Sequence, residues 1–345
     1  MPPPYRIGLL FDYPQPDGGA SFESAVRLGL GQTPARDVPV DVVTCETRGL
    51  PAGSAHDVVT GLRELERAGA VVVLGPSISD NGVEVSPVVD DLRLPCVNYT
   101  GGELTRGDWM FHYQVGSLEE EPAILAARAR ARGLGRVAVW YDDSIVGRGY
   151  HDWFVRATRT EGVDVVDARA VDPLAEDLGA RLRDSRDREP HGLVYLGLGV
   201  AARAVALALE AESWAVPVLA NSALMFGYAR RDWRDGWAGW EYVDTLADDN
   251  ETRSALRALA PKVAAGPLGC AAYDLGRLVG EAIVRAPEPT RAGLHEGLER
   301  VKQLPATSGY RGTTMGFGRW DRAALKGRFL VLRTWRNGSS VEAAA

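Results

Sequence analysis

Hydroxyl, carboxylate and amide side chains gather directly after the apolar run Val71–Leu74. A run of branched apolar residues that ends at a Gly-Pro pair is typical of a buried strand, and Ser, Asp and Asn residues after such a strand can cap a helix. The backbone N–H groups of that helix's first turn point outward, so the same corner can also hold an anion or a carbonyl group. The sequence leaves both interpretations open. The polar residues concerned are Ser77, Ser79, Asp80 and Asn81.

Polar residues also follow the other predicted strands. In open α/β sheets, ligands bind outside the carboxyl ends of the strands, so residues at these positions are candidates for function. Most of them are neutral hydrogen-bonding groups, which suit the holding of a small molecule better than its conversion. They are Asp12-Tyr13, Thr47-Arg48, Asn98-Tyr99-Thr100, Tyr141-Asp142-Asp143, Leu198-Gly199 and Asn221-Ser222.

Motifs of common enzymes are missing from the sequence, which contains no GxSxG, HExxH or GxxxxGK[ST]. The segment Gly197–Ala202 matches the GxGxxA pattern of a dinucleotide-binding turn, but the next strand ends in Asn221-Ser222, where an acid should hold the ribose. We interpret these glycines as a site of close strand-to-helix packing, and Asp142-Asp143 as capping residues rather than metal ligands. We expect no catalytic residue, no metal and no cofactor.

Strand-like and helix-like segments alternate along the chain, which predicts an α/β protein with doubly wound parallel sheets. One series of segments runs from Tyr5 to Ser117, and a second runs from Glu119 to Ser222. Three helix-like segments follow between Glu251 and Leu304. The last stretch, Met315–Trp335, has the pattern of a hairpin-like pair of strands.

Composition limits the partners. The chain has 345 residues, 46% of them apolar and 25% charged, which favours two soluble lobes of similar size. Its net charge of -7 argues against binding to nucleic acid, and no apolar run is long enough for insertion into a membrane. Cys45, Cys96 and Cys270 lie far apart, and we expect them to be buried and unpaired. An aromatic cluster that includes Tyr228, Trp233 and Trp237 is interpreted as packing.

The sequence resembles type I periplasmic binding proteins of the leucine/isoleucine/valine and amide-binding family over nearly its full length. The segments that carry the resemblance are Leu74–Ser117, Val137–Phe154, Gly192–Glu212 and Cys270–Ile283. The resemblance implies two Rossmann-like lobes joined by three hinge crossovers, with the ligand in a cleft between the lobes. Lobe I would comprise residues 1–117 and 247–325, and lobe II would comprise residues 118–246 and 326–345.

The resemblance also implies the site. In the family, the strand-to-helix corner gives a hydroxyl and backbone amides to a ligand carboxylate or carbonyl, and Ser79 falls there, with Ser77 nearby. The loop after the next strand gives further groups, and a carboxylate after the last strand of lobe II binds the ammonium of amino-acid ligands. The residue at that position is Ser222 in this sequence. Two other positions, which hold aromatic residues in the family, are Val146 and Gly199 here. The expected ligand-binding residues are Ser77, Ser79, Asn98, Tyr99, Thr100, Tyr141, Asn221 and Ser222.

The missing carboxylate at Ser222 favours a neutral or anionic ligand, such as an amide, a carboxylate or a small aromatic acid, because a buried ammonium without a counter-charge is costly. The expected function is non-catalytic closure on this ligand, with an ABC permease or an intracellular regulator as partner. A branched-chain amino-acid binding protein is the alternative, and a nucleotide-dependent enzyme is a more distant one. The N-terminus has no signal-peptide pattern, which predicts a cytoplasmic protein as written, or a periplasmic or extracellular one if a leader was trimmed.

Overall fold

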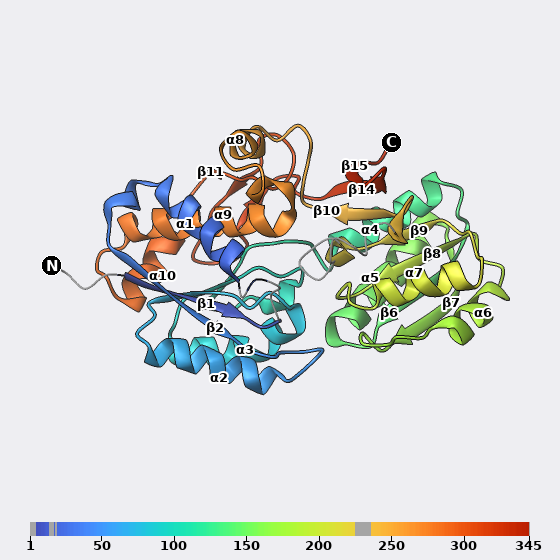
Figure 1. The fold of residues 1–345 in the computed structure, drawn as a ribbon, viewed down its shortest axis with the longest axis horizontal. Coiled ribbons are helices and arrows are strands. Elements are labelled where there is room, and N and C mark those ends of the chain that lie inside the picture. Colours follow the sequence, from blue (N-terminus) through green and yellow to red (C-terminus); the bar gives the residue numbers. More distant parts are fainter. Residues whose placement is uncertain (1–4, 14–16, 18, 225–235, 345) are drawn as a thin grey trace. The chain divides into compact units, whose positions relative to one another are not determined.

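The computed structural model describes residues 5–13, 17, 19–224 and 236–344, which belong to two compact α/β units (Figure 1). Unit 1 comprises Met1–Val115 and Asp249–Phe329, and unit 2 comprises Gly116–Asp248 and Leu330–Ala345. The chain therefore passes from one unit to the other three times. The lobe boundaries predicted from the sequence, after residues 117, 246 and 325, lie within a few residues of these divisions.

Unit 1 contains a five-stranded sheet in its described residues, with the strand order β2-β1-β3-β4-β5 and all neighbours parallel. Ile7 and Leu9 lie on an interior strand between two neighbours and are fully buried, as expected for a strand covered on both faces. The strands are β1 (Tyr5–Phe11), β2 (Val40–Glu46), β3 (Val72–Leu74), β4 (Cys96–Asn98) and β5 (Met110–His112), and a small antiparallel sheet adds β11 (Leu304–Pro305), β12 (Thr314–Met315) and β13 (Leu325–Lys326).

Helices cover both faces of this sheet (Figure 1). The two helices that follow β2 and β3 pack together on one face, and their apolar residues meet those of the strands in a core that includes Leu62, Val73 and Val89. The first and the ninth helix pack closely because glycines allow their backbones to meet: a Cβ on Gly29 would lie 2.1 Å from Tyr273 O. The helices are α1 (Ala20–Gly31), α2 (Ala55–Arg67), α3 (Ser79–Leu92), α8 (Glu251–Leu259), α9 (Pro267–Arg285) and α10 (Arg291–Glu299).

Unit 2 contains a seven-stranded sheet in its described residues, with the order β15-β14-β10-β9-β8-β6-β7. The sheet is parallel from β10 to β7, whereas β14 and β15 extend it as antiparallel strands. The prediction of a second doubly wound parallel sheet is therefore confirmed from β10 to β7, and the antiparallel strands add to it at one edge. The strands are β6 (Arg136–Asp142), β7 (Asp164–Val171), β8 (Gly192–Leu196), β9 (Val218–Ala220), β10 (Glu241–Asp244), β14 (Val331–Arg336) and β15 (Ser339–Glu342).

The helices of unit 2 also form two layers (Figure 1). On one face, Trp140, Leu182 and Val205 belong to a large buried apolar cluster. Trp237 and Trp240 belong to the same cluster, in agreement with a packing role, whereas Tyr228 and Trp233 lie outside the described residues. The helices are α4 (Glu120–Ala131), α5 (Ile145–Glu161), α6 (Gly179–Arg186) and α7 (Ala202–Ala211).

The predicted C-terminal hairpin is divided between the two units. β12 and β13 pair in unit 1, where Thr314 lies opposite Lys326. β14 instead pairs in unit 2 with β15, which the sequence analysis did not include, and Arg336 lies opposite Ser339 across the Asn337-Gly338 turn. Both turn residues have positive φ, 50° and 71°, as a tight hairpin turn of this kind requires.

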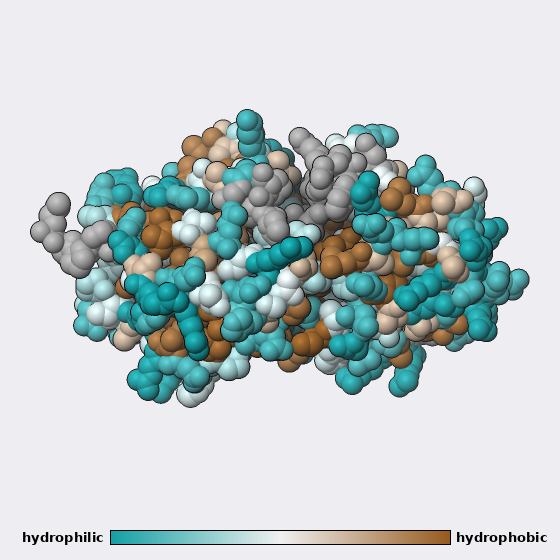
Figure 2. All heavy atoms as spheres, turned by 60° about the horizontal axis from the view of Figure 1, so that its bottom comes forward, coloured by the Kyte–Doolittle hydropathy of each residue, from teal (hydrophilic) through white to brown (hydrophobic). Residues whose placement is uncertain are grey.

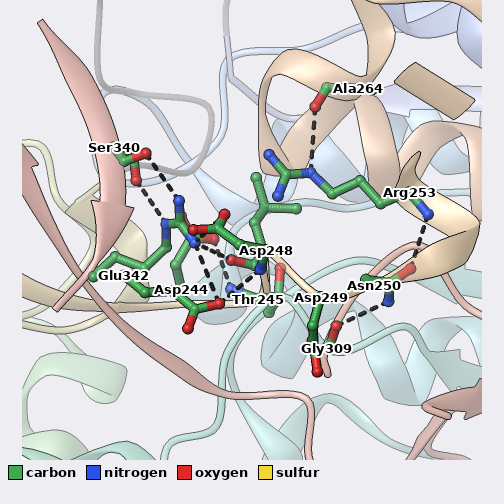
Figure 3. A network of polar contacts seen from close by, with 12 residues as sticks. Asp244, Thr245, Asp248, Asp249, Asn250, Arg253, Ala264, Gly309, Ser340 and Glu342 are labelled. Carbon is green, nitrogen blue, oxygen red and sulfur yellow. Dashed lines mark hydrogen bonds and ion pairs between the residues drawn. The ribbon is translucent and has the colours of Figure 1, made fainter. Parts of the chain in front are cut away.

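Buried polar residues hold the second passage of the chain between the units (Figure 3). On the unit 2 side, the guanidinium of Arg333 donates to Leu246 O at 2.5 Å and to Asp248 Oδ1 at 3.0 Å. On the unit 1 side, Asn250 Nδ2 donates to Gly309 O at 2.8 Å, while its Oδ1 accepts from the N–H of Arg253 and so caps α8. Each side of the crossover is thereby tied to its own unit.

On the face drawn in Figure 2, hydrophilic residues predominate, with smaller apolar areas between them. Within the described part of the chain, no helix combines the length and apolar character needed to cross a bilayer.

Candidate functional site

The corner between β3 and α3 is organised by Asp12, the residue that follows β1. Its carboxylate accepts hydrogen bonds from the N–H and the hydroxyl of Ser77, at 2.8 and 2.7 Å, from the N–H of Ile78 at 2.9 Å, and from Asn81 Nδ2 at 2.9 Å. Asp12 is fully buried, and this burial raises its pKa, while the hydrogen bonds with Asn81 and Ser77 oppose the rise. Ser77 and Asn81 are therefore occupied by the corner itself.

Ser79 has a different environment. It is the first residue of α3, the residue before it is Ile78, and no side chain caps this helix. Among the described residues no group bonds to the Ser79 hydroxyl, although the residue is only 6% exposed. The hydrogen bonds of α3 begin with Gly82 N donating to Ile78 O, so the N–H of Ser79 has no acceptor within the helix. This combination offers donors at a helix N-terminus.

The loop after β4 contains a closed network of side chains. Asn98 Oδ1 accepts from the hydroxyls of Thr100 and Thr105, at 2.9 and 3.2 Å, and Asn98 Nδ2 donates to Phe111 O at 2.9 Å. His112 Nε2 lies 3.3 Å from the Thr100 hydroxyl, and burial followed by the charge of Arg106 lowers the His112 pKa to about 3. Asn98 and Thr100 are completely buried, so both side chains brace the loop.

Tyr99 lies between these two residues and is buried to 1% exposure. Its ring stacks on Phe22 of α1, with centroids 5.0 Å apart. Burial and the charge of Asp12 raise the pKa of its hydroxyl well above the usual value, and a side-chain hydrogen bond with Ser77 acts in the opposite direction. The structure therefore brings Tyr99 and Ser77 together around Asp12.

In unit 2, Ser222 is bound to a buried carboxylate. Ser222 begins a 3-10 turn after β9, and both its N–H and its hydroxyl donate to Glu121, at 2.6 Å to Oε2 and 2.8 Å to Oε1. Glu121 Oε1 also accepts from the N–H of Ser117 at 2.7 Å and from the Tyr150 hydroxyl at 3.0 Å. The sequence has no carboxylate directly after this strand, yet the Glu121 carboxylate lies against Ser222.

Glu121 is completely buried, in contrast to Glu119 and Glu120 before it. Burial raises its pKa to about 7, and the hydrogen bonds with Ser222, Ser117 and Tyr150 limit the rise. Space around the pair is tight, because a Cβ on Gly116 would lie 2.2 Å from Ser222 Oγ and 2.3 Å from Glu121 Oε1. Only glycine fits at position 116 without a shift of this cluster.

The glycine-rich turn after β8 is filled by protein groups. Asp142 accepts from the N–H of Leu198 at 2.6 Å and from the Tyr195 hydroxyl at 2.8 Å, and a Cβ on Gly197 would lie 2.3 Å from the Asp142 carboxyl carbon. Asn221 binds the N–H and the carbonyl of Gly197, at 3.1 and 2.8 Å. The turn thus uses its glycine for close packing on Asp142, and Asn221 joins the ends of β8 and β9.

The remaining predicted positions of unit 2 lie apart from Ser222. Tyr141 ends β6, is partly exposed and stacks on His151, with centroids 4.4 Å apart. Val146 is buried on α5. Gly199 has a φ of +82°, and a Cβ there would lie 2.4 Å from Ala223 O, so a larger residue would strain this turn.

Cysteines and acidic residues show no metal-binding arrangement in the described part of the chain, where no group of three or more His, Cys, Asp or Glu side chains lies close enough to hold an ion. Cys96 and Cys270 are buried as expected, but Cys45 is partly exposed, which corrects that expectation. Asp143 pairs with Arg148 at the surface, and the neighbouring Ser144 caps α5.

Two α/β units that the chain crosses three times, with polar groups after their parallel strands, define the class of periplasmic binding proteins. The model of the Periplasmic binding protein family matches residues 4–325, and the chain belongs to this family. No curated protein matches it in sequence. The relationship is therefore carried by the family model and by the fold.

Solved structures with this fold cover 99% of the chain. A leucine binding protein, LivK, from Thermotoga maritima MSB8 is 16% identical with a TM-score of 0.80 over 98% of its own length. An ABC transporter substrate-binding protein from Desulfitobacterium hafniense in complex with Leu is 16% identical, with a TM-score of 0.77 over 100% of its length. A solute binding protein from R. palustris in complex with 4-hydroxybenzoate is 15% identical, with a TM-score of 0.80 over 96% of its length.

Proposed function

We propose that the chain is a non-catalytic solute-binding protein that holds a small ligand through Ser79 and the N-terminus of α3. The observation that carries the proposal is the contrast between two serines of one corner. Ser77 donates its hydroxyl and N–H to Asp12, whereas the Ser79 hydroxyl has no partner among the described residues. The Asp12 contacts fix the corner, and Ser79 remains available to bind a carboxylate or a carbonyl oxygen.

The proposed ligand class is neutral or anionic: an amide, a carboxylate or a small aromatic acid. Donors at the first turn of α3 suit an acceptor on the ligand, and the R. palustris neighbour was solved with an aromatic acid. As part of the same proposal, Tyr99 and Tyr141 are aromatic neighbours of the ligand, and Ser222 is a polar group that contacts it. Asn98, Thr100 and Asn221 then act by bracing the loops, because their side chains are bonded within their own units.

A branched-chain amino acid is the second candidate. The specific observation in its favour is Glu121, whose buried carboxylate lies 2.8 Å from the Ser222 hydroxyl and places an acceptor charge close to this strand end. Two neighbours, from T. maritima and D. hafniense, are named for leucine or were solved with Leu. The proposed partner is an ABC permease, with an intracellular regulator as the alternative.

A thermal-shift screen tests the proposal. The panel contains short amides and urea, aromatic carboxylates, and leucine, isoleucine and valine, applied to the intact chain and to Ser79→Ala. A ligand at about 1,000 times its dissociation constant adds roughly 4 kcal/mol to the free energy of unfolding, which is a shift of several degrees. Ser79→Ala should remove the response, while Ser86→Ala, a buried serine further along the same helix, should keep it. An unchanged response of Ser79→Ala would contradict the proposed site.

A further inference from the structure

The Ser222 hydroxyl already donates its one hydrogen bond, to Glu121. A serine hydroxyl can donate one hydrogen bond and accept others. Ser222 Oγ donates to Glu121 Oε1 at 2.8 Å, and the Ser222 N–H donates to Glu121 Oε2 at 2.6 Å. Toward any other molecule, Ser222 Oγ therefore offers only its lone pairs.

In its ionised form, which predominates above its pKa of about 7, Glu121 can only accept these bonds. Its two oxygens receive the Ser117 N–H and the Tyr150 hydroxyl in addition to the two groups of Ser222. Four donors thus point at one carboxylate from α5, from the turn after β9 and from the segment before α4. The side chain is 0% exposed, so a ligand does not reach it directly. Its effect on a ligand must pass through Ser222.

We propose that Glu121 is a positioning residue that makes Ser222 a hydrogen-bond acceptor, and that this strand end selects ligands whose facing group donates a hydrogen bond: an amide NH₂, a hydroxyl or an ammonium. The inference rests on the proposed function, because it assumes that Ser222 contacts the ligand. It extends that function by assigning opposite polarities to the two strand ends. Ser79 offers donors to a ligand acceptor, and Ser222 offers an acceptor to a ligand donor.

Electrostatics favour the same selection. A ligand carboxylate at Ser222 would face the lone pairs of Oγ and the nearby charge of ionised Glu121, without a proton to share. A dicarboxylate is therefore excluded more strongly than a molecule that carries one carboxylate and one donor. The glycine at position 116 keeps this arrangement close-packed, because any Cβ there would meet both Ser222 Oγ and Glu121 Oε1.

Matched ligand pairs test the selection by titration calorimetry at about pH 8.5, above the Glu121 pKa of about 7, where this carboxylate is ionised. Each pair shares a carboxylate and differs in one donor group. The donor lies at the far end in 4-hydroxybenzoate against benzoate and in glutaramate against glutarate, and next to the carboxylate in leucine against 4-methylpentanoate. In the unmodified chain, the donor-bearing member of the pair that binds should bind roughly tenfold more tightly than its partner. In Glu121→Gln, the Ser222 hydroxyl is released to donate, and the ratio of affinities should fall to near one.

Two further variants separate selection from general damage. Tyr150→Phe removes one donor from Glu121 without touching Ser222, and it should keep the tenfold ratio. Ser222→Ala removes the acceptor but leaves the backbone bond to Glu121, and it should lose the ratio even if Glu121→Gln does not fold. Equal affinity for both members of a pair in the unmodified chain, or a ratio that persists in Ser222→Ala, overturns this inference alone. Absence of binding by every member of the pairs overturns the proposed function and this inference together.

Discussion

Asp12 and Ser77 are 65 positions apart in the sequence, and one oxygen of Asp12 accepts both the N–H and the hydroxyl of Ser77, at 2.8 and 2.7 Å. These two hydrogen bonds between one carboxylate and one serine link the end of β1 to the corner after β3. With its bond to the N–H of Ile78, the Asp12 carboxylate fixes the segment just before α3. No side chain caps the helix itself, which begins at Ser79.

Asp12→Ala should therefore loosen the corner. The change leaves the N–H groups of Ser77 and Ile78 and the amide of Asn81 without their buried acceptor, so we expect a loss of about 3 kcal/mol in the free energy of unfolding. Urea denaturation measures this loss. Asp41→Ala is the matched control, because its ion pair with Arg6 is exposed and should contribute less than about 1 kcal/mol. Equal losses in the two variants would contradict the structural role of Asp12.

The pKa of Glu121 predicts a pH dependence of stability. Burial raises this pKa from 4.5 to about 7, so the native state retains a proton that the unfolded state releases at lower pH. The contribution to stability is fully present below about pH 4.5 and is lost as the pH rises through about 7, a change of about 3 kcal/mol. Urea denaturation between these pH values should show that Glu121→Gln lacks this decrease.

The difference between the unmodified chain and Glu121→Gln isolates this effect, since the other titrating groups are common to both. Glu84→Gln, at an exposed residue of α3, serves as control and should follow the unmodified chain at every pH. A difference between the unmodified chain and Glu121→Gln that is constant with pH would show that Glu121 does not titrate in this window.

Gly116→Ala should disturb Ser222 and Glu121 together. The added methyl group would lie 2.2 Å from Ser222 Oγ and 2.3 Å from Glu121 Oε1, and overpacking of this kind costs about 2 kcal/mol. Calorimetric melting compares it with Gly135→Ala, where an added Cβ meets nothing within 4 Å. A melting temperature of Gly116→Ala equal to that of Gly135→Ala would mean that this cluster rearranges without cost.

Much of the fold follows from the alternation of apolar strands and amphipathic helices, because that pattern is local. The division of the C-terminal hairpin does not follow from it, since the pairing of β14 with β10 in unit 2 depends on a residue far back in the chain: Val243 lies opposite Leu332. A local signal for β15 was present in Asn337-Gly338, a pair typical of tight hairpin turns. The hairpin predicted from the sequence ends at Trp335 and does not include β15.

The sequence predicts which residues follow the strands, but not which side chains these residues bond to. Residues after strands could be identified from the sequence, and Asp12 was among them, but its bonds to Ser77 and Asn81 depend on the neighbouring strand. Glu121 was missed because three consecutive glutamates at a helix start are typical of a solvated surface. Which of the three turns inward is decided by Ser117, Tyr150 and Ser222, which come from distant segments.

Arg333 should be important for the second crossover, because it bonds to Leu246 and Asp248 on the unit 2 side. Its guanidinium is buried and donates to Leu246 O and to Ser340 Oγ, at 2.5 and 2.8 Å. Arg333→Met removes these donors from the buried Leu246 carbonyl and from the partly exposed Ser340 hydroxyl. We expect a loss of about 3 kcal/mol in the free energy of unfolding, measured by urea denaturation. Arg336→Met, at an exposed residue of the same strand, should change it by less than about 0.5 kcal/mol. Similar values for both variants would rule out an anchoring role for Arg333.

The glycine turn after β8 predicts that the chain does not bind NAD. A dinucleotide needs the N–H groups of such a turn for its pyrophosphate, but the Leu198 N–H donates to the Asp142 carboxylate at 2.6 Å, and Asn221 holds the N–H of Gly197. NAD added at 1 mM, roughly the upper end of ordinary KM values, should leave the melting temperature unchanged. Asp142→Asn should lower the melting temperature, because a neutral amide accepts more weakly from Leu198 and Tyr195, and it should still give no response to NAD. A rise in the melting temperature of the unmodified chain with NAD would contradict this prediction and favour a nucleotide-dependent enzyme. The Asp142 carboxylate would then have to leave the turn when NAD binds.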